Sequence, residues 1–328
     1  MQSRKTSADL WHQKPYYSLD AWCKNTYGRK LYKAALDIGC TCPNRDGTLD
    51  TRGCIFCSAG GSGDFAAFRQ LSVTDQLNQA KALLSSKWTP EPGKPSLIAY
   101  FQAYTNTYGD PDRLLSCYEE ALSSPEVAGI SIATRPDCLS DIILEGLDRL
   151  RLLYPDRFIW IELGLQSIHD HTAARIRRGY PTSVFYDAAA KLHARRLPFI
   201  VHLILGLPGE TRLDLLESIR AVNQVHPFGV KLQLLHILKG TDLALLYEAG
   251  KLPVLTQEEY LDLLTSCIAA LSPDICLHRV TGDGPRKLLI APQWSLSKRN
   301  VLNGLHALMK QRNLRQGDNY EPGTSYTL

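Results

Sequence analysis

Short apolar runs alternate with amphipathic stretches through the middle of the chain, and this alternation constrains the fold more than any other feature. The apolar runs are rich in Ile, Leu and Val and are too short for surface helices, so they indicate buried strands. They are residues 36–40, 97–102, 129–133, 159–165, 199–205 and 230–237, and helical patterns lie at 74–86, 111–123, 140–154, 182–196 and 211–225. Six β–α units in series predict a parallel sheet with crossover helices. Such a sheet forms either a curved six-unit partial barrel or an open doubly wound sheet.

Polar residues mark where the predicted helices begin. Thr74, Ser140 and Thr182 stand where N-caps are expected, because a side-chain hydroxyl there accepts a hydrogen bond from the first helical turn. Beyond the last strand, residues 241–271 indicate helix, and a basic helix is predicted near 297–312. We therefore expect three parts, listed by residue range: a basic N-terminal extension (1–35), a barrel (36–240), and a helical, basic closing segment (241–328).

Charge is segregated along the chain, although the net charge is only +4. Residues 1–35 carry seven Lys/Arg against two Asp, and residues 279–315 carry eight Lys/Arg against one Asp. Residues 36–278 carry 22 basic against 28 acidic residues. Basic ends on an acidic body favour a polyanionic partner such as RNA, and a solvated basic surface is the alternative interpretation.

Several classes of protein find no support in the sequence. No apolar run approaches the roughly 18 residues of a membrane span, and the first residues lack the apolar core of a secretion signal. We therefore expect a cytoplasmic protein without a membrane partner. Phosphate-binding and dinucleotide-binding glycine loops and an ordered Ser-His-Asp set are also missing, so kinase and hydrolase interpretations have no basis. Nine cysteines, four of them clustered, point to metal or redox chemistry in a reducing compartment.

The cysteine cluster lies in DIGCTCPNRDGTLDTRGCIFC, directly after the first predicted strand. Thiolates of Cys40, Cys42, Cys54 and Cys57 can converge there, because Gly47 and Gly53 let the loop turn tightly. Four ligands would make a closed tetrahedral zinc site, whereas three would hold an iron–sulfur cluster with one iron open. The position after a strand favours the cluster, because such loops build the active site of parallel barrels. Cys40, at the end of an apolar run, is also typical of a buried packing thiol.

The segment CPNRDGTLDTRGCIFC, with Cys42-x11-Cys54-x2-Cys57, resembles the cluster loop of radical S-adenosylmethionine (SAM) proteins of the YhcC/YtqA-type branch. That branch is related to HemN and to the Elongator catalytic subunit. The likeness continues through residues 100–108, 131–139, 160–180, 201–211, 231–244 and 281–295. It implies an α/β fold, a partial (β/α)6 TIM-like barrel with short terminal extensions. It also implies SAM and one [4Fe-4S] cluster held by Cys42, Cys54 and Cys57, whose electron cleaves SAM to a 5′-deoxyadenosyl radical.

By the same resemblance, residues at the strand ends contact SAM. These predicted cofactor-binding residues are Gln102, Tyr104, Asn106, Arg135, Glu162, Gln166, Arg175, Gly206 and Gly209. A guanidinium suits the carboxylate of SAM, and glycines allow close approach of a flat ring. The predicted catalytic residues are Glu162, Lys231 and His236. For His236 a hydrogen-bonded interior histidine is the competing interpretation, and for Arg175 and Arg178 it is a solvated face.

The branch is associated with tRNA wobble-uridine modification, in which carboxymethylaminomethyl-uridine becomes aminomethyl-uridine. The resemblance therefore implies tRNA as partner and an electron donor such as flavodoxin or ferredoxin. Lys298, Arg299, Lys310, Arg312 and residues 24–33 would then contact phosphates. One alternative is a radical SAM enzyme acting on a small metabolite or a protein side chain. The other is a non-catalytic zinc or RNA-binding protein that uses all four clustered cysteines.

Overall fold

The computed structural model describes residues 10–84, 93–282 and 284–322, which form two compact units. Residues 29–164 and 177–199 make up the four-stranded unit. Residues 1–28, 165–176 and 200–328 make up the three-stranded unit. Within the described ranges, the helices are all too short or too polar to cross a membrane.

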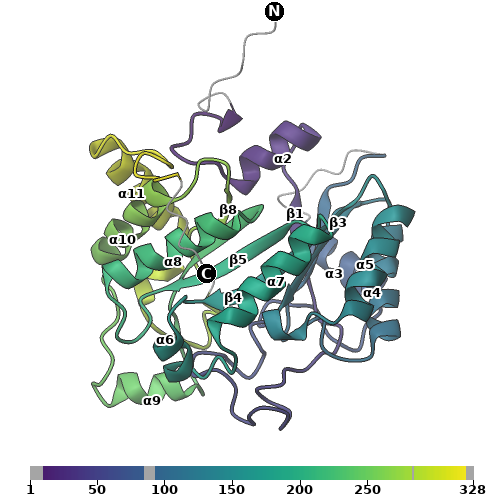
Figure 1. The fold of residues 1–328 in the computed structure, drawn as a ribbon, viewed down its shortest axis with the longest axis horizontal. Coiled ribbons are helices and arrows are strands. Elements are labelled where there is room, and N and C mark those ends of the chain that lie inside the picture. Colours follow the sequence, from purple (N-terminus) through teal and green to yellow (C-terminus); the bar gives the residue numbers. More distant parts are fainter. Residues whose placement is uncertain (1–9, 85–92, 283, 323–328) are drawn as a thin grey trace, which may run out of the picture. The chain divides into compact units, whose positions relative to one another are not determined.

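The four-stranded unit is a parallel sheet in the order β1-β2-β3-β4 with helices between its strands (Figure 1). Every residue of β2 is buried, as expected of a strand covered on both faces. Helices α4 and α5 pack side by side. The elements are β1 (Tyr32–Leu36), α3 (Val73–Leu84), β2 (Leu97–Phe101), α4 (Pro111–Ser123), β3 (Val127–Thr134), η1 (Pro136–Cys138), α5 (Asp141–Leu153), β4 (Phe158–Gln166) and α7 (Thr182–Ala194).

The three-stranded unit contains the parallel strands β5-β6-β8 and a short antiparallel pair, β7 with β9. Helix α10 packs against both α8 and α11. The elements are α2 (Leu19–Tyr27), α6 (Asp170–Arg175), β5 (Phe199–Leu205), α8 (Arg212–Val225), β6 (Gly229–Leu234), β7 (Ile237–Leu238), α9 (Asp242–Glu248), α10 (Gln257–Ala270), β8 (Cys276–Arg279), β9 (Leu289–Ala291), η2 (Gln293–Leu296) and α11 (Lys298–Gln311).

The first predicted strand was placed wrongly. The first strand was expected at residues 36–40. In the structure, β1 covers Tyr32–Leu36 and ends where the expected strand would begin. The alternating side chains of Leu36, Ile38 and Cys40 are all buried, at 0%, 6% and 4% exposure, but Gly39 has a left-handed φ of 73°. The backbone therefore leaves the ladder while its apolar side chains still face the core. The alternation of apolar residues therefore predicted correctly which side chains are buried, but it predicted wrongly that the backbone pairs with a neighbouring strand.

The predicted residue ranges of the helices agree with the structure better than the predicted N-cap residues do. Ser140 caps α5 as predicted. Thr74 and Thr182 are wrong as caps, because α3 begins one residue before Thr74 and Pro181 stands at the N-cap position of α7, without a side-chain capping hydrogen bond. Residues 241–271 form two helices, α9 and α10, rather than one. The predicted end of the first helix, at residues 85–86, lies outside the described ranges.

Candidate active site

The residues between β1 and α3, 37–72, form a loop that carries all four clustered cysteines; we call it the cysteine loop. Gln76 of α3 is fully buried and closes both ends of this loop. Its side-chain carbonyl accepts a hydrogen bond from Asp37 N at 2.9 Å, and its amide donates to the carbonyls of Asp37 (2.8 Å) and Leu71 (3.1 Å). A single side chain thus satisfies backbone groups at the start and the end of the loop.

Two turns place the three predicted ligands within the loop. Cys42 opens one turn, in which its carbonyl accepts a hydrogen bond from Arg45 N at 2.7 Å. Cys57 N donates to Cys54 O at 3.0 Å, which closes the second turn. Gly53, which precedes that turn, has a left-handed φ of 74°. The tight turning expected of Gly53 is therefore present in the structure.

A partly buried cation lies beside the second turn. The Arg45 guanidinium donates to the carbonyls of Cys57 and Ser58, both at 2.7 Å. Burial raises the pKa of Cys54 to about 12 and also raises the pKa of Cys57, while the positive charge of Arg45 opposes the rise at Cys57. Thiols in such a setting ionise readily only when a metal takes their charge.

A second loop is tied to the cysteine loop through Asn44. Its Nδ2 donates to Arg177 O at 2.7 Å and to Arg178 O at 3.0 Å, and it lies 3.6 Å from Cys54 Sγ. In return, Arg177 Nε donates to Gly53 O at 2.9 Å. Hydrogen bonds to cluster sulfurs tune the reduction potential, so an amide at this position suits a cluster ligand. Asn44 was not among the residues predicted from the sequence.

The remaining two cysteines near the loop differ in their surroundings. Cys40 is buried, which raises its pKa to about 11, and its charged neighbours are Arg113 and Asp37. Cys138, which the sequence leaves isolated, follows β3; burial, then Asp137, and to a smaller extent Cys42, raise its pKa to about 12. Cys138 therefore lies closer to the predicted ligands than sequence spacing indicated.

The thiol spacing bears on the choice between zinc and an iron–sulfur cluster. In the described part of the chain, no three cysteine sulfurs lie within 4.8 Å of one another. Tetrahedral zinc with Zn–S bonds of about 2.3 Å would bring its sulfurs to about 3.8 Å. No three sulfurs of the cysteine loop are that close together in the described residues.

The predicted SAM contacts after β2 hold the cysteine loop in this structure. Gln102 donates to Ser62 O at 2.7 Å, and Tyr104, with a left-handed φ of 61°, donates its hydroxyl to Ala59 O at 2.5 Å. Asn106 is fully buried and donates to two carbonyls, yet its Oδ1 accepts no hydrogen bond. A buried acceptor without a donor is costly. Asn106 Oδ1 therefore fits a ligand that brings an N–H group, as the ammonium of SAM does.

Arg135 lies beside the cysteines, but its guanidinium has protein partners. It donates bidentate hydrogen bonds to the carboxylate of Asp137, at 2.9 and 2.7 Å, and one hydrogen bond to Arg178 O at 2.8 Å. The guanidinium lies over the ring of Tyr180, with Arg135 Cζ 5.0 Å from the ring centre. Burial lowers the pKa of Arg135, but Asp137 raises it through a hydrogen bond and its charge, and Cys42 raises it further, so the net shift is upward. Contact between Arg135 and the SAM carboxylate stays a prediction.

Glu162 is fully buried on β4 and belongs to an ion pair. Its carboxylate accepts from Lys33 Nζ at 2.9 Å and from Ser131 Oγ at 2.6 Å. Lys33 also lies 4.4 Å from the ring centre of Tyr100. A buried carboxylate satisfied in this way is a structural group as it stands, and its predicted contact with SAM or substrate stays a prediction.

Several of the other predicted residues meet in the three-stranded unit. Gln166, at the end of β4, has a left-handed φ of 69° and a buried Oε1 without a hydrogen-bond donor. Arg175 donates to Pro208 O at 2.7 Å and lies over Gly209, where a Cβ would come within 1.9 Å of its guanidinium. Gly206 also has a left-handed φ, of 87°. Strain at Gln166 together with an unsatisfied acceptor is typical of a ligand-binding position.

Lys231 lies on β6, and His236 follows this strand in the same unit. Lys231 is 1% exposed and stands opposite His202 in the strand register. His236 Nε2 lies 3.1 Å from Ser295 Oγ. Burial, and then the charges of Arg279 and Lys298, lower the pKa of His236 to about 4. The imidazole is therefore neutral near pH 7, a form that can accept a proton.

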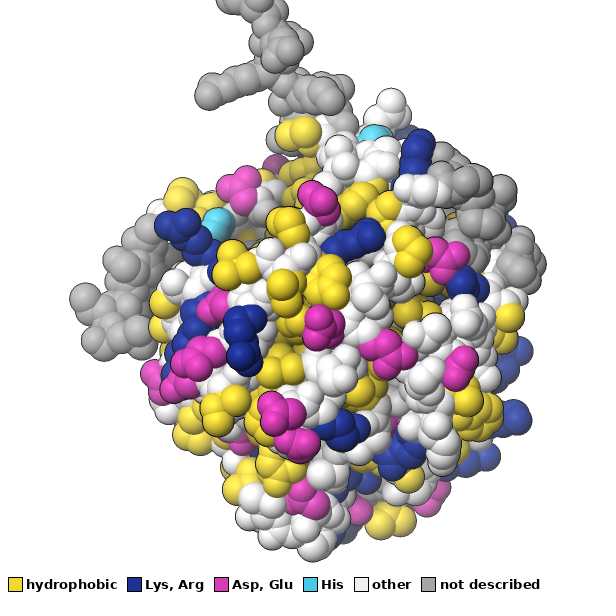
Figure 2. Space-filling model, turned by 90° about the vertical axis from the view of Figure 1, so that its right-hand side faces the viewer, with side chains coloured by type: hydrophobic (Ala, Val, Ile, Leu, Met, Phe, Trp, Pro, Cys, Tyr) yellow, Lys and Arg dark blue, Asp and Glu magenta, His cyan; other side chains and the backbone are white. Residues whose placement is uncertain are grey.

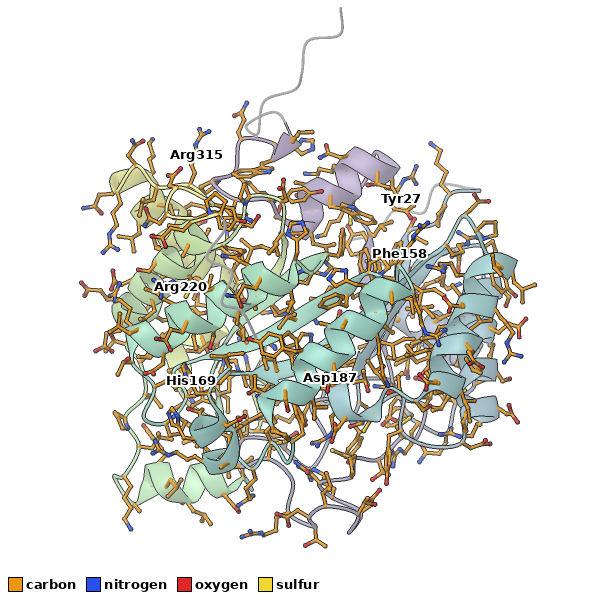
Figure 3. All side chains as sticks on the ribbon, viewed as in Figure 1. Tyr27, Phe158, His169, Asp187, Arg220 and Arg315 are labelled. Atoms are coloured by element: carbon orange, nitrogen blue, oxygen red, sulfur yellow. The ribbon has the colours of Figure 1, made fainter. Side chains whose placement is uncertain are left out.

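A further group of possible metal ligands lies at the start of α6. His169, labelled in Figure 3, has Nε2 within 3.6 Å of Glu217 and 3.8 Å of Asp214. Both His169 and Asp214 already serve the local fold. Nε2 of His169 lies 3.0 Å from the carbonyl of Asp214, and the Asp214 carboxylate closes the capping box of α8 with Thr211. This group is explained by helix packing.

Comparison with known proteins gives the family. Residues 42–222 match the radical SAM superfamily, and residues 227–311 match the radical SAM C-terminal domain. The chain is 40% identical over 305 residues to the protein YtqA of Bacillus subtilis (93% of this chain, 92% of YtqA). It is 36% identical over 271 residues to the protein YhcC of Escherichia coli K12 (82% of this chain, 84% of YhcC).

The fold is also that of solved radical SAM proteins. The archaeal Methanocaldococcus infernus Elp3 superimposes with a TM-score of 0.64 at 16% identity, over 87% of this chain and 64% of that structure. This likeness confirms the predicted α/β partial barrel. The matched region begins at Cys42 and includes all three predicted ligands. The chain therefore belongs to the radical SAM superfamily, whose members use a [4Fe-4S] cluster and S-adenosylmethionine.

Proposed function

We propose that this enzyme modifies the wobble uridine of tRNA, converting the carboxymethylaminomethyl form to the aminomethyl form. When bound, the cluster and SAM supply a 5′-deoxyadenosyl radical. Cys42, Cys54 and Cys57 would hold the cluster, and Asn106 offers a buried acceptor for a polar group of SAM. The substrate assignment depends on a different observation, the basic surface of the closing segment.

Helix α11 separates apolar and basic residues onto different faces. Val301, Leu305 and Met309 are buried at a spacing of four residues and form its packing stripe. Seven of the eight basic residues between 279 and 315 are exposed: Arg286, Lys287, Lys298, Arg299, Lys310, Arg312 and Arg315. A surface this rich in exposed cations suits a phosphate backbone. This exposure is the observation that supports tRNA as the substrate.

The N-terminal basic segment contributes less than its composition suggested. Lys33 is engaged with Glu162 at 2.9 Å, so it is not a phosphate ligand. Lys24 pairs with Asp20 at 3.1 Å. Lys30 lies over the ring of Tyr32 and remains exposed. Of residues 24–33, the exposed Lys24 and Lys30 stay as candidates for phosphate contact.

His236 is our candidate for accepting a proton from the substrate. Its imidazole is neutral near pH 7, and Ser295 fixes the position of one ring nitrogen. Gly282 packs against the ring so closely that a Cβ there would lie 2.3 Å from it. The ring is therefore held in one orientation, which general acid–base catalysis requires.

Mass spectrometry of nucleosides from bulk tRNA tests the proposed function. Cells lacking the gene should lose aminomethyl-type uridines and accumulate the carboxymethylated precursor. The wild-type gene should restore the profile, and a Cys57→Ala allele should not. An unchanged profile, in a strain known to contain these nucleosides, would exclude the tRNA substrate and direct the search to metabolites or proteins.

Substitution of exposed α11 residues tests the tRNA contact itself. Lys298→Glu with Arg299→Glu should weaken tRNA binding and make it less dependent on salt, because fewer counterions are released. SAM cleavage in the absence of tRNA should not change. Lys239→Glu with Lys251→Glu, which lowers the net charge equally at exposed residues of the same unit outside α11, serves as the control for altered net charge. Unaltered tRNA binding by the α11 variant would remove this helix from the interface.

A further inference from the structure

The eleven residues between Cys42 and Cys54 fold back on themselves, so that their two ends meet. Asn44 O accepts a hydrogen bond from Gly53 N at 2.7 Å, which closes the segment close to both cysteines. Residues 45–52 therefore leave the chain and rejoin it at one place, and we call them the excursion. The separation between the two cysteines is set by this closure rather than by the length of the excursion.

Arg45 is the first residue of the excursion, and it contacts the chain beside each of the three predicted ligands. Its backbone N–H donates to Cys42 O at 2.7 Å. Its side chain then passes over Gly53, the residue before Cys54, where a Cβ would lie only 2.7 Å from Arg45 Nε. Its Nη2 donates to Cys57 O, also at 2.7 Å. A single residue thus joins the two turns that carry the ligands.

The positive charge of Arg45 is not neutralised by an ion pair with any carboxylate of the described residues. Its guanidinium donates to the carbonyls of Cys57 and Ser58, which carry no charge. The carboxylate of Asp64 follows in the same loop, but its two oxygens accept from Ser58 Oγ, at 3.0 and 2.8 Å. The charge of Arg45 is therefore left to act on the neighbouring cysteine ligand.

The other two arginines of the cysteine loop are paired with carboxylates. Arg52 Nε lies 3.7 Å from Asp50 Oδ1, and Arg69 Nη2 lies 3.5 Å from Asp37 Oδ1. A similar mixing of charges is seen on the face of the molecule in Figure 2, where Lys and Arg side chains are interspersed with Asp and Glu. Arg45 differs from these cations because its partners are neutral carbonyls next to a ligand.

A positive charge beside a cluster ligand changes the reduction potential of the cluster. One added electron makes the cluster more negative, so a nearby cation stabilises the reduced form and raises the potential. The same attraction acts on the Cys57 thiol, where burial raises the pKa while the charge of Arg45 and a hydrogen bond from it oppose the rise. An opposite charge within about 4–6 Å shifts such an equilibrium by at least about tenfold.

We propose that Arg45 is a positioning residue of the radical reaction, which joins the three ligand cysteines and raises the reduction potential of the cluster that they hold. This role depends on Cys42, Cys54 and Cys57 as ligands and is independent of the substrate, so a metabolite or protein substrate would leave it unchanged. The two parts of the role are separable, because the hydrogen bonds need the planar fork of a guanidinium, whereas the potential needs only a positive charge.

The test is a potentiometric titration of the reconstituted, anaerobic holoenzyme without SAM, followed by the EPR signal of the reduced cluster. Arg45→Gln should lower the reduction potential by about 59 mV, which corresponds to a tenfold smaller ratio of reduced to oxidised cluster. Arg45→Lys should keep the wild-type potential, but it should release iron to a chelator faster, because an ammonium lacks the planar fork. Arg52→Gln is the matched control; it removes one positive charge from a 65% exposed side chain of the same loop and should change neither property.

Each other outcome overturns the proposal. An unchanged potential in Arg45→Gln, or an equal fall in Arg52→Gln, would show that the charge of Arg45 does not set the potential. An equal fall in Arg45→Lys would assign the effect to geometry instead of charge. Iron release at the wild-type rate from both Arg45 variants would show that this side chain does not hold the ligands together.

The Arg45→Lys variant also decides the case in which Arg45→Gln retains no iron. A wild-type potential in Arg45→Lys then supports the role of the charge, and a lowered potential overturns it. Loss of the cluster from both variants would leave Arg45 with a structural role alone and would overturn its effect on the potential.

Discussion

Asn44 joins the cysteine loop to the backbone at residues 177–178, so replacing it should loosen the cluster site. The residue is 2% exposed, and its Nδ2 makes hydrogen bonds of 2.7 and 3.0 Å to two carbonyls. Each buried hydrogen bond contributes about 1 kcal/mol, and each abandoned carbonyl costs about 1–3 kcal/mol. With two carbonyls abandoned, Asn44→Ala should therefore lower the free energy of unfolding by about 2–6 kcal/mol. Asn44→Asp, nearly identical in shape, should lower it further because a carboxylate oxygen would face two carbonyl oxygens.

Two measurements on anaerobic holoenzyme check this prediction. Urea unfolding should rank the proteins wild type, Asn44→Ala, Asn44→Asp in falling stability, and the rate of iron release to a chelator should rise in the same order. Asn25→Ala is the control, because its amide also donates to a carbonyl, at 2.8 Å, but on the surface; it should change stability by less than about 0.5 kcal/mol. An Asn44→Asp enzyme as stable as wild type, and as slow to lose iron, would refute the reasoning.

Three further substitutions test the surrounding fold. Lys33→Met removes an ion-pair partner from the fully buried carboxylate of Glu162 and should cost about 3 kcal/mol in urea unfolding, part of which the added Glu162→Gln should restore. Ser140→Ala removes the N-cap of α5 and should cost about 1 kcal/mol in the same assay, and an unchanged urea midpoint would contradict the cap. The pKa of His236 is lowered from 6.5 to about 4, so the unfolded chain takes up the proton first as pH falls. The contribution of His236 to the free energy of unfolding is fully present above pH 6.5. As the pH falls from 6.5 to 4, this contribution is lost, by about 3 kcal/mol. His236→Gln should flatten this part of the stability profile, and a profile as steep as that of wild type would assign the loss to other groups.

Sequence periodicity predicted the elements whose side chains pack in a regular pattern. Residues 199–205 were expected as a strand and are β5, and residues 111–123 were expected as a helix and are α4. The strand is one largely apolar run, and the helix buries residues at intervals of three and four. The segment 36–40 was misplaced because its alternation continues into a loop that also buries every second side chain. Local pattern reports which side chains face the core, and it cannot report whether the backbone still pairs with a neighbouring strand.

The cysteines of the site could be predicted because all of them lie in one short segment at a spacing typical of metal ligands. The residues that position the loop could not, because their partners are distant in the chain. Gln76 acts on the backbone of residue 37, and Asn44 acts on a carbonyl 133 residues away. Neither amide stands in a motif, and an amide in a polar loop is ordinarily solvated. Such contacts follow from the packing of whole elements rather than from spacing.

Gly179 packs against the side chain of Asn44, and this contact gives a test of coupling between the two residues. Its φ is +84°, and a Cβ there would lie 2.4 Å from Asn44 Oδ1. Gly179→Ala should therefore incur two costs: about 1 kcal/mol for the left-handed backbone, and a clash that displaces Asn44 from its two carbonyls. In an Asn44→Ala background the clash is gone, so Gly179→Ala should then cost only the backbone part. Equal costs of Gly179→Ala in both backgrounds, measured by urea unfolding, would show that the two residues are not coupled.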